Sequence, residues 1–455
     1  MKTAKSLFLA SSLLYGTLWA ATLNKRTTED SLIVYNSNIG LVHEQRELSI
    51  IQEEKSIVYE GVASSIDVDS INVILPQELK LKSQQYRFDK LTQNKLLEAH
   101  IDKKIEVRLL RDGQSFKIIS ATLLSSEGTK SIVRAMDGNI LTVNSDDIIF
   151  HDIPQELITK ASLVWNVDVQ KDINAPMELD YLIKNISWQS NYILNIFENE
   201  ASLDGWISID NRSGKAYDAV DLYLLAGDIN RATQTPIQYK EARAMALANS
   251  VQVTHQAHEG YHFYTVPFKV SLANNEKTQI KFISKTQLPI QRKLRVLLSD
   301  PRYLSGQEEH SVLQYVRLSA LDIALPKGVV HSFSKLGKTN ILLGESLLAH
   351  TPKESDIELE LGKSFDVKVT ESIESRDDDT THSRSTIRYL LKNSSNEAKT
   401  VKILIPFMKS QNAQVETEYP FTFTHGERVT LEVPLEAMGT KEIFIHFNSQ
   451  KVTLV

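Results

Sequence analysis

Residues Leu179–Arg231 decide the fold class of this chain. They read LDYLIKNISWQSNYILNIFENEASLDGWISIDNRSGKAYDAVDLYLLAGDINR. Short runs of alternating apolar and polar residues, rich in aromatic and β-branched side chains, are interrupted by Asn, Asp, Ser and Gly, as at Ser213-Gly214-Lys215. This pattern is typical of consecutive antiparallel strands joined by tight turns. The stretch therefore predicts an all-β fold, and it contains no pattern that identifies a reaction.

The same alternation continues through most of the chain and predicts several domains. A chain of 455 residues exceeds the size at which a single hydrophobic core stops growing. We expect antiparallel β-sandwiches, together with a small β-barrel or a simple meander at about 103–152. The predicted parts are a signal peptide at 1–21, an N-terminal β-rich region at 22–155, a central sandwich at 156–324 and a C-terminal sandwich at 325–455.

Two segments interrupt the strand pattern and predict one or two short helices. Thr92–His100 has Lys95, Leu96 and Glu98 at helical spacing, and Thr92 is suited to cap its amino terminus. Tyr239–Ser250 is rich in alanine, which favours a short helix or a crossover segment.

The first residues have the features of a secretory signal peptide. Lys2 and Lys5 are followed by Leu7–Trp19, which is apolar apart from Ser, Thr and Gly, and then by Ala20 and Ala21. The apolar run is too short to span a bilayer comfortably. We expect cleavage after Ala20 or Ala21, a periplasmic or secreted protein, and no transmembrane segment after cleavage.

Composition excludes several classes of function. The formal net charge of -6 becomes -8 when Lys2 and Lys5 are removed, and no dense basic block is present, so nucleic acid is a poor candidate partner. The chain has no cysteine, which excludes disulfides, thiolate nucleophiles and cysteine-based metal sites.

Three separated sets of residues carry a resemblance to a known family. The sets are Val34-Tyr35-Asn36 with Tyr86–Leu91, then Tyr181, Trp188, Tyr192, Leu222-Tyr223-Leu224 and Gly227-Asp228, and last Leu343-Gly344-Glu345, His350-Thr351-Pro352-Lys353 and Leu361-Gly362. In order and spacing they resemble the bacterial exported proteins that carry the domain of unknown function 4139. The match extends over almost all of the mature chain.

This resemblance implies β-sandwich domains and an envelope location, and it implies no activity. Ile193 departs from the family, which more often has Asp after the tyrosine, and the chain lacks the long coiled-coil insertion of the relatives that resemble mucoidy inhibitors. The family-motif residues are expected to have structural roles; they are Tyr181, Trp188, Tyr192, Gly227, Gly344, His350, Pro352 and Gly362.

His258-Glu259-Gly260-Tyr261-His262 matches the zinc-protease pattern H-E-x-x-H, and His255 lies three residues upstream. That pattern binds zinc when a helix places both imidazoles on one face. Here a strand-like run follows at once, and residues four apart on a strand lie roughly 13 Å apart, too far to share one zinc ion. His255, His258 and His262 are therefore only a weak candidate for metal binding, and no cofactor is predicted.

Tyr181, Trp188, Tyr192 and Trp206 could line a platform for sugar or pack between sheets. Their alternation with apolar neighbours favours packing. We therefore favour a non-catalytic binding or assembly module of the bacterial envelope, whose partner is another envelope protein or a polysaccharide. The alternatives are a hydrolase of envelope polymers and a carbohydrate-binding adhesin. An exposed aromatic patch would favour the adhesin, and long open sheet edges would favour assembly.

Overall fold

The computed structural model describes residues 23–111, 115–154, 157–226, 254–258, 261–319, 321–379, 381–407, 413–424 and 428–450. The predicted signal peptide, the alanine-rich segment Tyr239–Ser250 and Gly227 lie outside the described residues. The structure is about 68% strand and 4% helix, which confirms the all-β prediction.

The chain forms two compact units, each assembled from three stretches of sequence. The first unit comprises Met1–Ser187, Asp210–Leu224 and Phe268–Lys277, and the second comprises Trp188–Ile209, Leu225–Pro267 and Thr278–Val455. The domain boundaries inferred from the sequence stay a prediction.

The first unit is built around three long antiparallel strands. β2 (Ile39–Ile50) pairs with β1 (Leu23–Tyr35) on one side and with β12 (Ile173–Lys184) on the other. β12 also pairs with β4 (Asn72–Ile74), and β1 has β15 (Tyr217–Ala226) as its other neighbour, which in turn pairs with β18 (Val270–Leu272). A smaller sheet contains β3 (Ser56–Glu60), β11 (Ser162–Val169) and β5 (Leu79–Arg87), and η1 (Val68–Ser70) is a single 3-10 turn.

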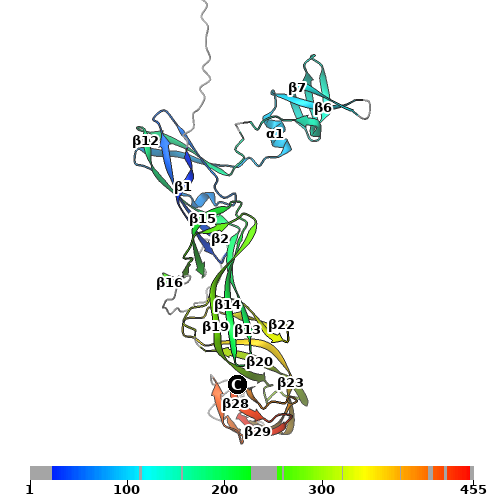
Figure 1. Ribbon diagram of the computed structural model, residues 1–455. Helices are drawn as coiled ribbons and strands as arrows, with labels where there is room; N and C mark the ends of the chain where they lie inside the picture. Colours follow the sequence, from blue (N-terminus) through cyan, green and yellow to red (C-terminus); the bar gives the residue numbers. More distant parts are fainter. Residues whose placement is uncertain are drawn as a thin grey trace, which may run out of the picture. The chain divides into compact units, whose positions relative to one another are not determined.

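A five-stranded sheet in the first unit has its own core. Its strands are β6 (Lys104–Arg111), β7 (Ser115–Glu127), β8 (Lys130–Ala135), β9 (Ile140–Asn144) and β10 (Ile148–Ile149), with η2 (Ser145–Asp147) before β10. They pair in the order β10-β6-β7-β8-β9, so within the described residues the sheet stays open (Figure 1). β10 pairs with β6 and not with β9 among the described strands, so the order differs from that of a simple meander, and the sheet is not a closed barrel either.

The predicted short helix is confirmed as α1 (Gln93–Ala99). The Thr92 hydroxyl accepts a hydrogen bond from the Lys95 backbone N–H at 3.3 Å, the contact that an N-cap residue provides. Leu97 of α1 is buried in the core of the five-stranded sheet with Val107 and Leu123. The helix thus covers one face of this sheet.

The second unit contains a longer series of strands. They are β13 (Ile186–Ile196), β14 (Glu200–Asn211), β16 (Thr254–His258), β17 (Tyr261–Thr265), β19 (Glu276–Leu297), β20 (Gln307–Leu318), β21 (Gly328–Leu336), β22 (Thr339–Leu348), β23 (Ile357–Asp378), β24 (His382–Asn393), β25 (Lys399–Pro406), β26 (Gln414–Glu416), β27 (Phe421–Thr424), β28 (Arg428–Leu435) and β29 (Thr440–Gln450). The order of the main sheet is β22-β21-β13-β14-β19-β20-β23-β24-β29-β26, with β25 between β19 and β28 and β27 beside β28. β16 and β17 pair with each other and are not part of this sheet.

Side chains from distant strands of this series share one core. Ile387 of β24 and Ile445 of β29 belong to the same buried cluster as Ile403 of β25 and Leu431 of β28, so two layers of strands face each other as in a sandwich. Most strand pairs of the second unit are antiparallel, as predicted, and two pairs depart from this pattern. β13 pairs with β21, and β19 pairs with β25, in parallel. Strands this far apart in the sequence take their direction from the tertiary fold, and a local pattern does not encode it.

Among the described residues, none of the helices has both the length and the apolar character needed to cross a bilayer.

Candidate functional site

The histidine motif lies on a β-hairpin. His255 and His258 belong to β16 and His262 to β17, and the register places Ala257 opposite His262 and His258 opposite Tyr261. Glu259 and Gly260 lie outside the described residues. A hairpin lacks the helical spacing that the protease pattern needs, and metal binding by the three histidines stays a prediction.

Three of the motif aromatics point their polar atoms into the protein. The Tyr181 hydroxyl donates to Glu44 Oε1 at 3.0 Å, the Trp188 Nε1 to the Leu225 carbonyl at 3.1 Å, and the Tyr192 hydroxyl to the Pro326 carbonyl at 2.6 Å. All three side chains are buried. These side chains pack in the core and hold neighbouring groups through hydrogen bonds. They are therefore not part of an exposed sugar-binding platform.

The other motif residues described occupy turns and close approaches. A Cβ atom on Gly344 would lie 2.5 Å from the Leu361 carbonyl oxygen, so only glycine fits there, and Gly362 has a φ of +125°. His350 lies two residues before Pro352, and its Nδ1 accepts a hydrogen bond from the Lys327 backbone N–H at 3.2 Å. These contacts position backbone and offer no reactive group.

Several charged side chains line a cavity in the first unit, where β1, β2 and the segment leading into β15 meet. The cavity has a volume of about 460 Å³, and Asp30, Glu44, Arg46 and Lys215 are among the residues that line it. Glu44 is only 2% exposed and Arg46 only 5%. Burial of charges at this level is costly unless each charge is paired and hydrogen-bonded.

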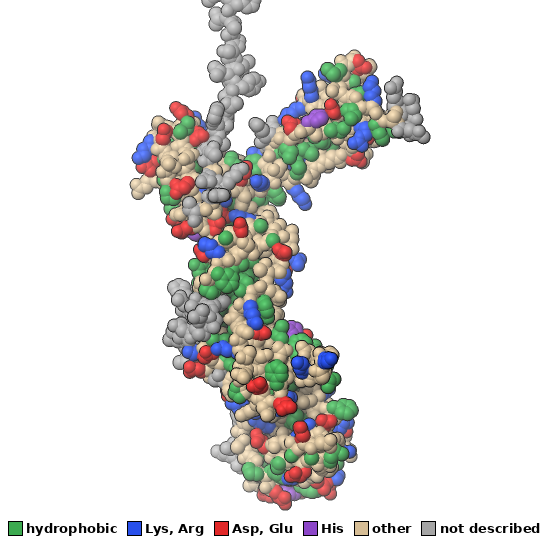
Figure 2. Space-filling model, viewed as in Figure 1, with side chains coloured by type: hydrophobic (Ala, Val, Ile, Leu, Met, Phe, Trp, Pro, Cys, Tyr) green, Lys and Arg blue, Asp and Glu red, His purple; other side chains and the backbone are tan. Residues whose placement is uncertain are grey.

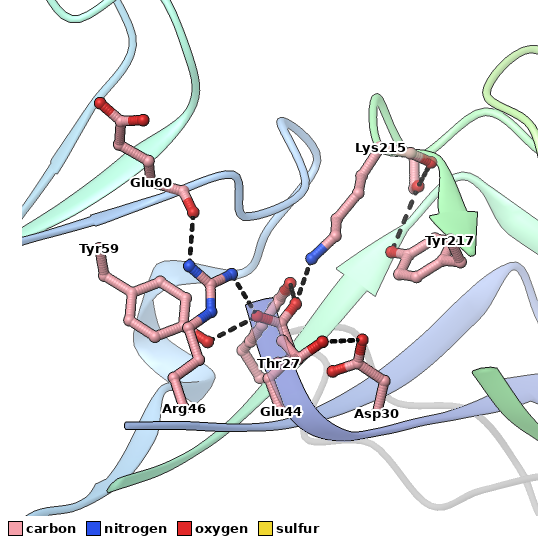
Figure 3. Close-up of polar contacts among 10 residues, drawn as sticks. Thr27, Asp30, Glu44, Arg46, Tyr59, Glu60, Lys215 and Tyr217 are labelled. Atoms are coloured by element: carbon pink, nitrogen blue, oxygen red, sulfur yellow. Dashed lines mark hydrogen bonds and ion pairs between the residues drawn. The ribbon is translucent and has the colours of Figure 1, made fainter. Parts of the chain in front are cut away.

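Four side chains donate to the Glu44 carboxylate, and Figure 3 labels three of them, Arg46, Tyr59 and Lys215. Oε2 accepts from Arg46 at 2.7 Å and from the Tyr59 hydroxyl at 2.5 Å. Oε1 accepts from the Tyr181 hydroxyl at 3.0 Å and also from Lys215 Nζ. The carboxylate is therefore held on both oxygens by strands and turns that are distant in the sequence.

Arg46 is fixed on several sides as well. Besides its bond to Glu44, it donates to the Glu60 carbonyl at 2.9 Å, and its guanidinium carbon lies 3.8 Å from the centre of the Tyr59 ring. A guanidinium over an aromatic face is attracted by the ring quadrupole. The Tyr59 ring in turn lies 5.6 Å from that of Trp165. The ion pair is thus built into the aromatic core of the unit.

The sequence of β2 explains why these charges are inside. Residues two apart on a strand share a face, so Glu44 and Arg46 project to the same side as the buried Val42. Asp30 of β1 is the direct partner of Glu44 across the strand pair. Two carboxylates opposite each other repel, and Lys215 and Arg46 supply the compensating positive charge.

The environment moves the pKa values of the two carboxyls in opposite directions. Burial acts to raise the pKa of Glu44, but the charges of Lys215 and Arg46 and the hydrogen bonds from Lys215 and Tyr59 outweigh it and lower this pKa to about 2. Burial raises the pKa of Asp30; the hydrogen bond from Thr27 opposes this shift and the nearby charge of Glu44 adds to it. Burial and the charge of Glu44 also raise the pKa of Tyr59 and of Tyr181, which stay neutral donors.

The chemistry open to this cluster is limited by its own hydrogen bonds. Both oxygens of Glu44 are engaged twice, so Glu44 is not free to take a proton from a substrate. Asp30 Oδ1 and Arg46 Nε are buried without a hydrogen-bond partner among the described residues. The cluster therefore holds β2, β3, β12 and the turn before β15 together, and it is not arranged as an acid and base pair.

Sequence reasoning missed this cluster. Its members come from positions as far apart as Glu44 and Lys215, which are separated by 171 residues. One signal was available, since a charged residue on the buried face of an apolar strand requires a partner. The identity of that partner depends on strand pairing.

No protein-family model matches the chain, and a comparison with curated proteins gives no significant match. The resemblance to the proteins with the domain of unknown function 4139 accordingly rests on the sequence motifs alone.

Proposed function

We propose that this protein is a non-catalytic, exported module of the bacterial envelope that binds an extended segment of another envelope protein. The observation that carries the proposal is β22, which lies at the end of its strand series and pairs only with β21 among the described strands. β23 contacts β22 at Gly344 and at Ser346, whose hydroxyl donates to the Glu360 carbonyl, so the open edge is the stretch Thr339–Leu342. Such an edge presents unpaired backbone donors and acceptors, and a foreign strand can add to it.

The composition of β22 fits a binding edge. Of its ten residues only Glu345 is charged, and that carboxylate is paired with His331 at 3.0 Å. Leu342 is 53% exposed and Leu347 is 68% exposed. Natural proteins usually protect such edges with lysine, proline or a bulge. The register between β22 and β21 shifts after Leu342. The four residues before this shift, Thr339–Leu342, pair regularly with β21.

The alternatives receive less support from the site geometry. A hydrolase of envelope polymers needs a carboxylate that can exchange a proton, and Glu44 is fully engaged. An adhesin needs exposed aromatic rings, whereas Trp188 and Tyr192 are buried. Acidic and basic side chains are interspersed on the face shown in Figure 2, which favours a protein partner over a nucleic acid.

Site-specific photocrosslinking tests the proposal in the native host. A photoreactive residue is placed at Leu342, and the control carries it at Met438, which at 68% exposed is more accessible than Leu342 and lies in the same unit. We expect one protein to be crosslinked from Leu342 and not from Met438. Absence of any product, or the same products from both positions, contradicts the proposal.

Purified partner then shows whether the contact is strand addition. Hydrogen exchange of the backbone amides in Thr339–Leu342 should slow when the partner binds, because a new strand protects the open edge. Leu342→Lys should weaken binding, since a lysine on an edge opposes pairing. The interface lies elsewhere if the partner binds without slowing this exchange and binds the Leu342→Lys variant as tightly as the wild type.

A further inference from the structure

Two strands of the second unit bring together three side chains that ligate metals. Glu308 and His310 belong to β20 and Glu371 to β23, and one ligand atom from each lies within 4.8 Å of the others. His310 Nε2 is 2.6 Å from Glu371 Oε1 and 3.9 Å from Glu308 Oε2. This group is separate from the Glu44 cluster of the first unit and from the histidine hairpin.

The strand register explains the convergence. Glu308 is the direct cross-strand partner of Glu371, and His310 lies two residues further along β20, on the same face as Glu308. Like charges directly opposite each other destabilise an antiparallel pair. A cation beside the two carboxylates reduces this repulsion, and the His310 imidazole becomes a third ligand when its Nε2 gives up the proton shared with Glu371 Oε1.

Glu371 provides an independent observation that points to a ligand. The side chain is 0% exposed, and its Oε2 has no hydrogen-bond partner among the described residues. Its other oxygen accepts from His310 and from the Ser299 backbone N–H at 3.1 Å. The hydroxyl of Tyr389, the partner of Glu371 on β24, is also buried and without a partner in the described part of the chain. A buried carboxylate oxygen without a protein partner is expected where an ion or a bound water completes its contacts.

We propose that Glu308, His310 and Glu371 form a binding site for a divalent transition metal ion, with zinc as the best fit. One imidazole nitrogen and two carboxylate oxygens are donors that zinc accepts, and water can complete a four-coordinate shell. Glu308 is exposed and gives the ion a route from solvent. Two carboxylates and a neutral imidazole balance the charge of one divalent ion. Ser299 orients both carboxylates. Its hydroxyl donates to Glu308 Oε2 at 2.9 Å, and its backbone N–H donates to Glu371 Oε1.

Calorimetric zinc titration of the mature full-length protein tests the site. The protein is purified without a histidine tag and stripped of metal with a chelator. We expect one zinc ion per chain, an affinity that falls at least about tenfold in Glu308→Gln, and loss of binding in His310→Gln. The matched control is Glu309→Gln, because Glu309 lies between the two ligands in sequence and pairs with Lys368 at 2.7 Å instead. Its affinity should be unchanged.

A second variant separates this site from the histidine hairpin. A chain with His255, His258 and His262 all changed to Gln should keep its zinc affinity.

Zinc should also raise the unfolding temperature of the wild type and not that of Glu308→Gln, whose exposed position keeps the variant folded. The proposal is overturned if the wild type binds no zinc, if Glu308→Gln and His310→Gln bind as the wild type does, or if the hairpin variant loses all binding.

Discussion

Glu44 is the single side chain on which the buried charges of the first unit depend. Replacing it by Gln keeps the size of the side chain but removes the carboxylate with which Lys215 and Arg46 form their ion pairs. Breaking a buried ion pair by removing one partner costs about 3–5 kcal/mol. We expect Glu44→Gln to lower the free energy of unfolding of the first unit by this amount, measured by urea-dependent hydrogen exchange of peptides from β2 and β12.

The matched control for this substitution is Asp221→Asn in the same unit. Asp221 pairs with Lys269 at 3.0 Å, and both side chains are more than half exposed. An exposed ion pair contributes roughly 0–1 kcal/mol, so Asp221→Asn should leave the exchange of β2 nearly unchanged. Equal effects of the two substitutions would mean that the Glu44 cluster contributes no more than a surface pair.

The lowered pKa of Glu44 also predicts how stability depends on pH. A carboxyl whose pKa is lower in the folded state contributes stability above its unfolded value of 4.5, and this contribution is lost as pH falls from 4.5 to about 2. The loss is on the order of 3 kcal/mol. Asp30 acts in the opposite sense, because its pKa is raised and its protonation on acidification restores some stability. Unfolding of the wild type and of Glu44→Gln, measured between pH 6 and 2 in the same urea series, should converge at the acidic end; parallel curves contradict the assignment.

At the scale of elements, the turn between β14 and β15 places Lys215 beside Glu44. Gly214 has a φ of +82°, and a Cβ atom added there would lie 1.8 Å from Ser64 Oγ. We expect Gly214→Ala to destabilise the first unit by at least about 1–2 kcal/mol, the cost of a left-handed conformation alone. Much of this loss should disappear when it is measured in the Glu44→Gln background, since the two changes act on the same ion pair. Additive losses would show that the turn and the ion pair are independent.

The elements themselves were largely predictable from local sequence. The Ser213-Gly214-Lys215 turn lies where the pattern places it, between β14 and β15, and α1 begins after its Thr92 cap. Strand partners were not predictable, because alternation shows which face of a strand is buried and says nothing of its neighbour. Asp30 and Glu44 come from adjacent strands, yet the lysine that neutralises them lies on a distant turn. The candidate site was missed for this reason.

At the scale of the whole molecule, long-range pairing decides the organisation. Each compact unit collects three stretches of chain, whereas composition and turn signals describe only what is continuous in sequence. β13 and β21 pair in parallel although several other strands lie between them in the sequence. Such contacts form slowly and expose strand edges while they form. Because the chain has no cysteine, no disulfide contributes to the stability of these long-range contacts.

The amino terminus gives the last prediction, which concerns the location of the whole protein. Lys2, Lys5 and the apolar run Leu7–Trp19 have the features of a secretory signal, and Ala20 and Ala21 fit its cleavage site. We expect cell fractionation to place the protein in the periplasm or the medium, with Ala21 or Thr22 as its first residue by mass spectrometry. Leu13→Arg should retain the uncut chain in the cytosol, because a charge within the apolar run opposes membrane insertion. An uncut wild-type chain in the cytosol would remove the basis for an envelope partner, and with it the proposed role of the β22 edge.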